Sequence, residues 1–286
     1  MNLFSFANYS TNKKIRLIEL FAGMGTQAQA LNRLGVDFEH HYVCEFDKYA
    51  IMVYNAIHDT NFETTDVTQI HAEDLNITEK DKYTYILTYS FPCQSLSLAG
   101  KQEGMKKGSG TRSGLLWEVE RLLNECTELP DILLMENVPQ VHSEQNKNDF
   151  DDWLSFLRSK GYHNFYKDLN AKNFGVPQNR DRCFCVSILS KDFVDYEFPN
   201  EIKLNSQMKD LLEPVVDEKY YINSPKATEL IEKLIVEDKL SSGETVLLSN
   251  QGTKLEKKTD IATCLMARDY KGFGNQSMNE VIECVM

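Results

Sequence analysis

One cysteine of this sequence stands in an unusual setting. Cys93 directly follows Pro92 in SFPCQSLSLAG, where small and polar residues open toward a glycine. The preceding stretch KYTYILTY (82–89) alternates and is rich in β-branched and aromatic residues, which predicts a strand. A thiol at the end of a strand, held by a proline and followed by a loop, is well placed to act as a nucleophile.

Other residues that could do chemistry also follow predicted strands. In open α/β sheets, ligands bind beyond the carboxyl ends of the strands. The residues at the predicted strand ends are Phe21, Ala22, Gly23, Met24, Gly25, Glu45, Asp66, Pro92, Cys93, Gln94, Glu136 and Asn137. We therefore expect these side chains to gather at one edge of a sheet.

The elements that must position them alternate between strand and helix. Strands are predicted in 15–20, 38–43, 82–89, 131–138 and 182–189, with a weaker one ending at Asp66, and helices in 26–35, 48–58, 113–126 and 150–163. This alternation predicts an α/β fold with a doubly wound, Rossmann-like sheet. After about residue 195 the pattern changes to one helix from Pro225 and short β-prone pieces, so we expect a main domain over 1–195 and a smaller region over 196–286.

The glycine turn and two acids suggest a ligand. Gly23 and Gly25 let a ligand approach the backbone at a helix start, but the third glycine of a dinucleotide fingerprint is missing. Glu45 suits the two hydroxyls of a ribose, and Asp66 could accept from an adenine amino group. Together they predict an adenosine-containing ligand without a pyrophosphate, and S-adenosylmethionine fits better than NAD.

Composition and charge narrow the class of protein. The 286 residues are 42% hydrophobic and 26% charged, as in an ordinary globular protein, and show neither a membrane span nor a secretory signal, which predicts a cytoplasmic protein. Seven cysteines without a C-x-x-C pair fit neither a disulfide framework nor a zinc site, so we expect reduced thiols and no metal.

The net charge of −12 speaks against a protein coated in nucleic acid, but phosphate contacts need only one basic face. The segment 101–112 offers such a face, because it carries four basic residues against the single acid Glu103.

Four blocks then resemble a known family. ELFAGMGTQ, SFPCQSLSLAGKQ, MENVPQV and GVPQNRDRCFCV, in this order over about residues 15–190, resemble the signature blocks of the DNA (cytosine-5)-methyltransferases. Thr26 stands where many members have another glycine. The resemblance implies an S-adenosylmethionine-dependent catalytic domain over 1–195, a partial target-recognition region over 196–286, and double-stranded DNA as substrate.

The resemblance also implies a mechanism. Cys93 would add to carbon 6 of a cytosine and so activate carbon 5 toward the methyl group. Glu136, with a pKa raised in a closed pocket, would protonate or hydrogen-bond the ring nitrogen N3. Asn137 would brace the loop or touch the base. Arg180 and Arg182 offer fork geometry to the ring carbonyl, a phosphate or Glu136.

Further roles follow from the same resemblance. Arg182 would lie nearest the base, and Gln178 would support the active-site loop. The base must be flipped out of the duplex, so the glycine-rich segment 95–112 would close on DNA as a lid. The expected cofactor contacts are Phe21, Ala22, Gly23, Gly25, Thr26, Glu45, Phe46, Asp66, Val67 and Pro92. The expected DNA contacts are Gln94, Ser97, Lys101, Gln102 and Arg112.

Two alternatives and one open question are left. A branch of the family methylates transfer RNA with nearly the same blocks, and a non-catalytic or split subunit could bind the cofactor without turnover. No stretch matches the family block R-x-L-T-x-x-E-x-x-x-x-Q-G-F, although Gly274-Asn275 resembles a degenerate form of the block after it. We therefore expect an incomplete recognition region, with the missing blocks either on a complementary polypeptide or lost, in a protein of bacterial or phage origin.

Overall fold

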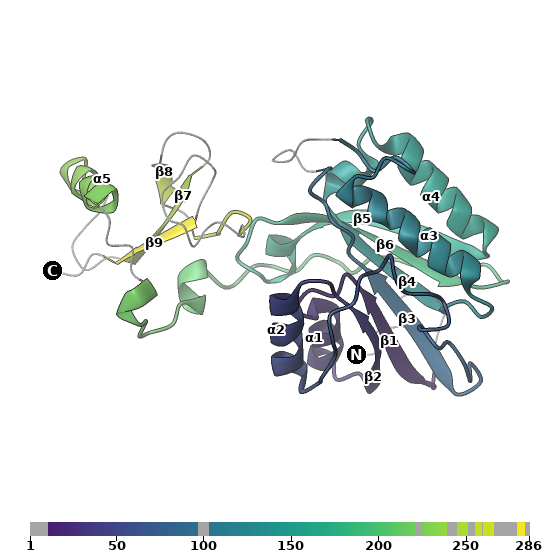
Figure 1. Ribbon diagram of the computed structural model, residues 1–286. Coiled ribbons are helices and arrows are strands. Elements are labelled where there is room, and N and C mark those ends of the chain that lie inside the picture. The colour runs from purple at the N-terminus through teal and green to yellow at the C-terminus, as the bar shows by residue number, and fades with distance from the viewer. Residues whose placement is uncertain are drawn as a thin grey trace. The chain divides into compact units, whose positions relative to one another are not determined.

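The computed structural model describes residues 11–96, 103–220, 225–238, 245–250, 255–258, 260–265 and 279–283. The chain divides into two compact units (Figure 1). The first comprises Met1–Leu169 and Arg182–Pro199, and the second comprises Asn170–Asp181 and Asn200–Met286. The segment 170–181, which the sequence analysis assigned to the first region, thus packs with the second unit.

A six-stranded sheet organises the first unit. Its strands are β1 (Lys14–Leu20), β2 (Phe38–Cys44), β3 (Tyr83–Tyr89), β4 (Ile132–Asn137), β5 (Tyr162–Asn170) and β6 (Asp181–Leu189). They lie in the order β2-β1-β3-β4-β6-β5. β1 is parallel to β2 and β3, and β3 is parallel to β4, whereas β6 runs antiparallel to β4. The predicted α/β sheet is confirmed, and it is mixed.

The register of the parallel strands brings their carboxyl ends to one level. Leu20, the last residue of β1, pairs with Cys44 of β2 and with Tyr89 of β3. Tyr89 in turn pairs with Met135 of β4. The residues that follow these four strands therefore leave the sheet along one edge, as ligand-binding residues do in open α/β sheets.

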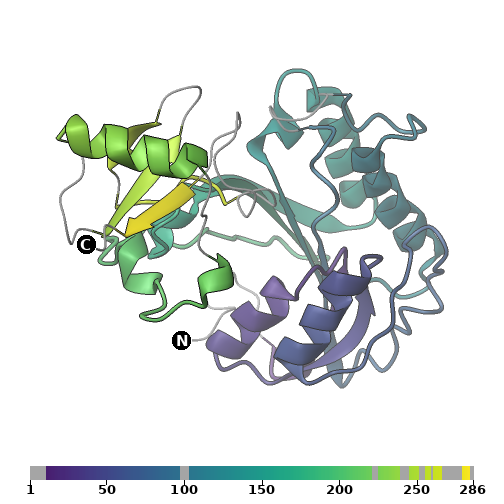
Figure 2. The same cartoon turned by 60° about the vertical axis from the view of Figure 1, so that its left-hand side comes forward.

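Helices cover both faces of the sheet (Figures 1 and 2). Their bounds are α1 (Thr26–Arg33), α2 (Lys48–His58), α3 (Leu116–Glu125) and α4 (Lys147–Ser159), and short 3₁₀ helices are η1 (Arg112–Leu115), η2 (Pro139–His142), η3 (Ala171–Phe174), η4 (Met208–Leu211) and η5 (Glu218–Tyr220). Leu17 and Ile86 point to one face of the sheet and pack with α1. The next residues along these strands, Ile18 and Leu87, point to the other face, under α3 and α4.

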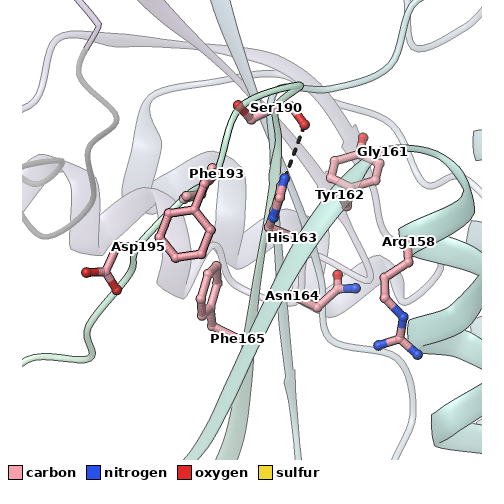
Figure 3. A pocket seen from close by; sticks show the side chains of 10 residues that line it. Arg158, Gly161, Tyr162, His163, Asn164, Phe165, Ser190, Phe193 and Asp195 are labelled. Atoms are coloured by element: carbon pink, nitrogen blue, oxygen red, sulfur yellow. Dashed lines mark hydrogen bonds between the residues drawn. The ribbon is translucent and has the colours of Figure 1, made fainter.

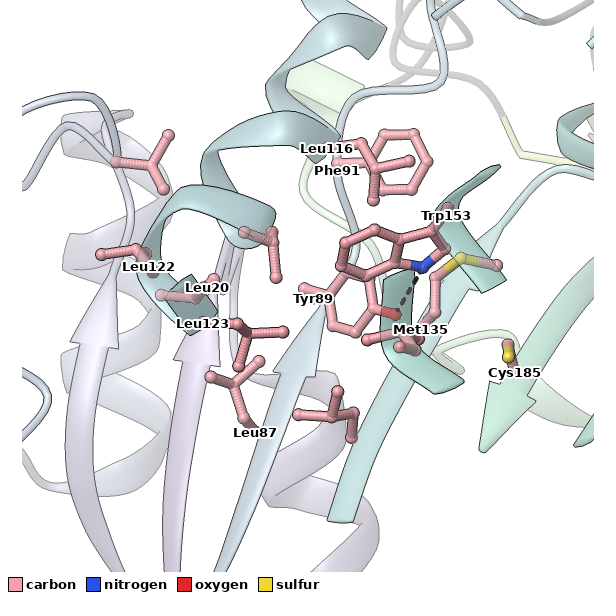
Figure 4. Close-up of a cluster of buried hydrophobic side chains, with 14 of the residues drawn as sticks. Leu20, Leu87, Tyr89, Phe91, Leu116, Leu122, Leu123, Met135, Trp153 and Cys185 are labelled. Atoms are coloured by element: carbon pink, nitrogen blue, oxygen red, sulfur yellow. Dashed lines mark hydrogen bonds between the residues drawn. The ribbon is translucent and has the colours of Figure 1, made fainter. Parts of the chain in front are cut away.

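The larger core lies under α3 and α4 (Figure 4). Trp153 of α4 is fully buried, and its indole N–H donates to the hydroxyl of Tyr89 at 3.1 Å. Leu122 and Leu123 of α3 pack in the same cluster with Leu87. Burying such side chains stabilises the fold by about 1.5–3 kcal/mol each, so the ends of β3 and β4 are anchored on a rigid layer.

Two sequence predictions about elements are wrong. No strand ends at Asp66, because residues 61–66 make no ladder with the edge strand β2 and only one backbone hydrogen bond beside it, from Thr65 N to the carbonyl of Glu45, the residue after β2, at 2.8 Å. The helix predicted over 150–163 spans Lys147–Ser159 instead. Gly161, at φ 95°, follows it and leads into β5, a strand that the sequence analysis did not predict.

Among its described residues, the second unit contains one α-helix and a small sheet, besides the 3₁₀ helices η3, η4 and η5. α5 (Pro225–Val236) begins at the predicted proline, and β7 (Thr245–Asn250), β8 (Leu255–Lys258) and β9 (Asn279–Glu283) form an antiparallel sheet in the order β8-β7-β9. Its role as a target-recognition region stays a prediction. Among the residues that the structure describes, no helix is long and apolar enough to cross a membrane.

Candidate active site

The turn after β1 is built for close backbone approach. Phe21, Gly23 and Gly25 all have positive φ, of 57°, 57° and 77°. At Gly25 a Cβ atom would lie 2.3 Å from Nε2 of His58 and 2.6 Å from the ring of Tyr54, so only glycine fits. The turn then enters α1 at Thr26, which exposes the amide groups of a helix start to a ligand.

Glu45 closes this turn from the end of β2. Its Oε2 accepts from the backbone N–H of Gly23 at 2.7 Å, and its Oε1 accepts from that of Asp47 at 2.8 Å. An ionised carboxylate offers about four lone-pair sites, so about two are left for hydroxyl donors. The next residue, Phe46, is 76% exposed and presents a free ring face beside the turn.

Asp66 lies near Glu45 although no strand carries it there. The hydrogen bond from Thr65 N to Glu45 O places it, and its Oδ1 accepts from both the N–H and the hydroxyl of Thr68 at 2.9 Å. The neighbouring Val67 is buried, which fixes the turn to the core. The structure thus keeps the two predicted acids together, on a loop instead of two strand ends.

The stretch after β3 forms a tight turn around the candidate nucleophile. The carbonyl of Cys93 accepts from Leu96 N at 2.9 Å, and its half-buried side chain packs against the larger core. Ser113 holds the turn, because its hydroxyl donates to Pro92 O at 2.6 Å and lies 3.3 Å from Ser95 N. Sequence reasoning missed Ser113, whose signal is only a serine near the start of a helix.

The end of β4 carries an ion pair and a buried amide. Arg182 Nε lies 2.9 Å from Glu136 Oε1, and both side chains are mostly buried. Asn137 is buried, donates to Phe91 O at 2.9 Å and accepts from Val138 N at 2.9 Å. Of the two predicted roles for Asn137, this geometry favours bracing the loop. Of the partners predicted for Arg182, the structure places Glu136 in contact with it.

The predicted DNA contacts are described in part. Arg112 donates to Oε1 of Gln94 at 2.6 Å, and both are exposed. Lys107 is one of the four basic residues of 101–112. Its ammonium group lies 2.6 Å from Glu120 and 5.2 Å from the centre of the Trp117 ring, so its charge is paired with side chains of α3. The predicted contacts Ser97, Lys101 and Gln102, and the Gly274-Asn275 pair, lie outside the described residues.

The other two predicted catalytic residues belong to the second unit. Arg180 donates from Nη1 to Sγ of Cys264 at 3.1 Å. Gln178 forms an isolated bridge with Ala262, and the adjacent Asn179 N donates to Ala262 O at 2.7 Å. Their segment is therefore tied to the second unit by backbone hydrogen bonds.

A buried carboxyl group under the glycine turn was not predicted. Glu19 is fully buried, accepts from the hydroxyl of Tyr54 at 2.5 Å and lies 3.4 Å from Ala28 N in the first turn of α1. Tyr54 also contacts His40 Nδ1 at 2.6 Å. The signal in the sequence is an acid inside the apolar strand KIRLIEL.

Glu19 should make stability depend on pH. Burial raises its pKa from 4.5 to about 7, against hydrogen bonds from Tyr54 and Ala28 that lower it. Because the folded pKa lies above the unfolded one, its stabilising contribution is complete below the unfolded pKa and is lost as pH rises through about 7. Relative to wild type, Glu19→Gln should gain stability between about pH 5 and pH 8, by at most about 3 kcal/mol.

Urea unfolding at several pH values measures this difference. Glu63→Gln, an exposed control, should follow wild type at every pH. A Glu19→Gln curve parallel to that of wild type would mean that Glu19 does not titrate in this range.

A cavity of about 450 Å³ lies away from this edge (Figure 3). It is lined by residues at the start of β5 and after β6, among them His163, Phe165 and Phe193. Ile188, near the end of β6, pairs with Ile132 at the start of β4, so the cavity lies at the opposite end of the strands from Glu136. It contains none of the predicted site residues.

The edge thus combines a thiol, a carboxylate–guanidinium pair and a glycine turn closed by Glu45. Comparison with known proteins gives the family: the model for C-5 cytosine-specific DNA methylase matches residues 15–276. The chain belongs to this family. Members of the C-5 cytosine-specific DNA methylase family use S-adenosylmethionine. The family predicted from the four sequence blocks is confirmed.

Two relatives illustrate the family. The chain is 33% identical to the type II methyltransferase M2.ScrFI of Lactococcus lactis subsp. cremoris, over 75% of this chain and 72% of that protein. It is 36% identical to the orphan methyltransferase M.SssI of Spiroplasma monobiae, over 74% of this chain and 68% of that protein.

Solved structures show the same fold. The S. pombe Dnmt2 methyltransferase matches with a TM-score of 0.63 at 17% identity, over 93% of this chain and 75% of that one. The Entamoeba histolytica methyltransferase EhMeth matches with a TM-score of 0.65 at 20% identity, again over 93% and 75%. At these identities the likeness concerns the fold alone.

Proposed function

We propose that this chain transfers a methyl group to carbon 5 of a flipped-out cytosine in double-stranded DNA, through a covalent bond between Cys93 Sγ and carbon 6. The observation that carries the proposal is the arrangement of the strand ends. Cys93 follows β3, the Glu136–Arg182 pair stands at the end of the adjacent β4, and the Gly23–Glu45 turn follows β1 and β2 on the same edge.

The turn fits S-adenosylmethionine. The free lone pairs of Glu45 would accept from the two ribose hydroxyls, and the exposed Phe46 and half-buried Phe21 offer ring faces to the adenine. Asp66 would accept from the adenine amino group with the oxygen that Thr68 leaves free. When bound, S-adenosylmethionine supplies an electrophilic methyl group.

The side chains of the edge would perform the remaining steps. The Cys93 thiolate attacks carbon 6 while Glu136 gives a proton to N3, which turns carbon 5 into an enamine-like nucleophile. Arg182 holds the carboxyl group of Glu136 in place. After methyl transfer, carbon 5 loses its proton to a base, the Sγ–carbon 6 bond breaks and N3 returns its proton to Glu136, which regenerates the thiolate and the carboxylic acid.

DNA is the proposed substrate because the matching family model is a DNA methylase and the relatives named above are type II and orphan methyltransferases. The exposed Gln94, directly after Cys93, and its hydrogen-bond partner Arg112 would meet the strand from which the base is flipped. A complementary polypeptide that completes the recognition region stays a prediction from the sequence.

A covalent trap tests the function. Duplex DNA containing 5-fluorocytosine, incubated with the protein and S-adenosylmethionine, should give a protein–DNA adduct that survives denaturation, because fluorine cannot leave carbon 5 as a proton does. Transfer RNA with labelled methyl donor is the parallel assay. Methylation of transfer RNA but not of DNA would contradict the proposed substrate, and absence of both would contradict the function.

The cofactor assignment makes a separate prediction. Glu45→Ala should weaken binding of S-adenosylmethionine by about 1–3 kcal/mol, because two ribose hydroxyls lose their acceptor in a site shaped for them. Isothermal titration calorimetry measures the affinity. Glu63→Ala, an exposed acid on the loop toward Asp66, is the control and should bind like wild type. Equal affinities for Glu45→Ala and wild type would refute the ribose contact.

A further inference from the structure

Three side chains with different donor atoms meet on the first unit. His142 of η2, Asp168 of β5 and Cys183 of β6 each offer a ligand atom, and these atoms all lie within 4.8 Å of one another. His142 Nε2 lies 2.9 Å and 3.1 Å from the two oxygens of Asp168. Sequence spacing gives no hint of this cluster, because its members lie 26 and 15 residues apart.

The surroundings hold the three donors in place. The His142 ring packs against those of Phe150 and Tyr166, with centroids at 6.0 Å and 5.6 Å, and these two rings also contact each other. Cys183 is fully buried and pairs across the sheet with Asn137. The side chains of His142 and Asp168 are 29% and 39% exposed, so an ion could reach the buried sulfur from their side.

We propose that His142, Asp168 and Cys183 form a binding site for Zn²⁺. A tetrahedral zinc ion with bonds of about 2.0–2.3 Å places its ligand atoms about 3.3–3.8 Å apart, which is close to the spacing found here. Imidazole and thiolate ligands favour zinc over magnesium or calcium, which take oxygen ligands. Three protein ligands leave one coordination position for water.

The ion would displace the proton of the Cys183 thiol. In the structure Asp168 is the common hydrogen-bond partner of His142 and Cys183, and burial, followed by the charge of Asp168, raises the pKa of the Cys183 thiol well above its usual range. Zinc binding therefore has to displace the thiol proton, which lowers the apparent affinity. In return it ties η2 to β5 and β6, and a ligand that binds only the folded chain stabilises it.

Zinc and cobalt titrations test the site without reference to methyl transfer. The parent protein for these titrations carries Cys93→Ser, which removes the half-buried thiol of the candidate nucleophile as a competing metal ligand. Calorimetry of this protein with Zn²⁺ should show one strong site per chain. Co²⁺ should give a thiolate-to-metal absorption band. Zinc should also raise the thermal unfolding temperature. Loss of an outer-shell partner costs about 10–100-fold in metal affinity, so loss of a ligand should cost at least about 100-fold.

Variants decide whether these three residues hold the metal. His142→Ala and Asp168→Asn change accessible side chains, so the test does not depend on the folding of Cys183→Ser. All three should lose the strong site, and Cys183→Ser should lose the cobalt band. Two control variants should keep both the strong zinc site and the cobalt band. Cys185→Ala changes an equally buried cysteine two residues along β6, and His71→Ala changes the histidine of an exposed pair with Glu125. Zinc affinity unchanged by His142→Ala and Asp168→Asn, or no strong site in the parent protein, would overturn the proposal.

Discussion

Cys93→Ser should lower the rate of methyl transfer to DNA by more than about 10³-fold, while S-adenosylmethionine still binds. The hydroxyl is a far weaker nucleophile than a thiolate, so the attack on carbon 6 is lost. The Gly23–Glu45 turn is built by other strand ends and should stay intact. Transfer of labelled methyl groups to duplex DNA measures the rate, and calorimetry measures cofactor binding.

Cys44→Ala is the matched control. Cys44 is buried at the end of β2, and burial, followed by the charges of Glu45 and Asp66, raises its pKa to about 12, so it is a poor source of thiolate. The variant should lose about 1–3 kcal/mol of stability and keep the chemistry, as should alanine variants of Cys183 and Cys185. A Cys93→Ser protein as active as wild type would eliminate Cys93 as the nucleophile.

Glu136→Gln should lower the rate of methyl transfer by about 10²–10⁴-fold. The amide keeps the shape of the side chain and can still meet Arg182, but it cannot pass a proton to N3 of the base. Binding to duplex DNA, measured by fluorescence anisotropy, should change little by comparison. Formation of the adduct with 5-fluorocytosine DNA should slow in parallel with turnover, because protonation assists the attack itself.

Glu144→Gln separates this effect from a general change of charge. Glu144 is exposed just beyond η2, so its amide variant should keep full activity. If Glu136→Gln bound DNA poorly and turned over normally once saturated, Glu136 would act in binding and not in proton transfer.

Much of the candidate site could be predicted because strand ends leave a local signal. KYTYILTY before Cys93 is rich in β-branched and aromatic residues, and DILLMENV around Glu136 holds an apolar run. Each becomes a buried parallel strand, β3 and β4. Burial on both faces imposes such a composition on the sequence itself. The positions of Cys93 and Glu136 at one edge then follow from the rule for parallel sheets.

What could not be predicted depends on partners distant in the sequence. TTDVTQI has β propensity, but beside the edge strand β2 it finds one backbone hydrogen bond instead of a ladder. Ser113 acts through contacts with Pro92 and Ser95, and Glu19 through Tyr54, which pattern and propensity do not reveal. Gln178 and Arg180 precede β6, yet backbone hydrogen bonds assign their segment to the second unit.

The continuous register from Cys44 through Leu20 and Tyr89 to Met135 has a consequence for changes of chain length. Side chains alternate between the two faces of a strand, so inserting or deleting one residue within β3 would exchange the side chains packed under α1 with those packed under α3 and α4, or carry Cys93 to the wrong side. Among natural or engineered versions of this chain, the strands that end at Leu20, Tyr89 and Asn137 should therefore keep their length, and insertions or deletions should fall outside them.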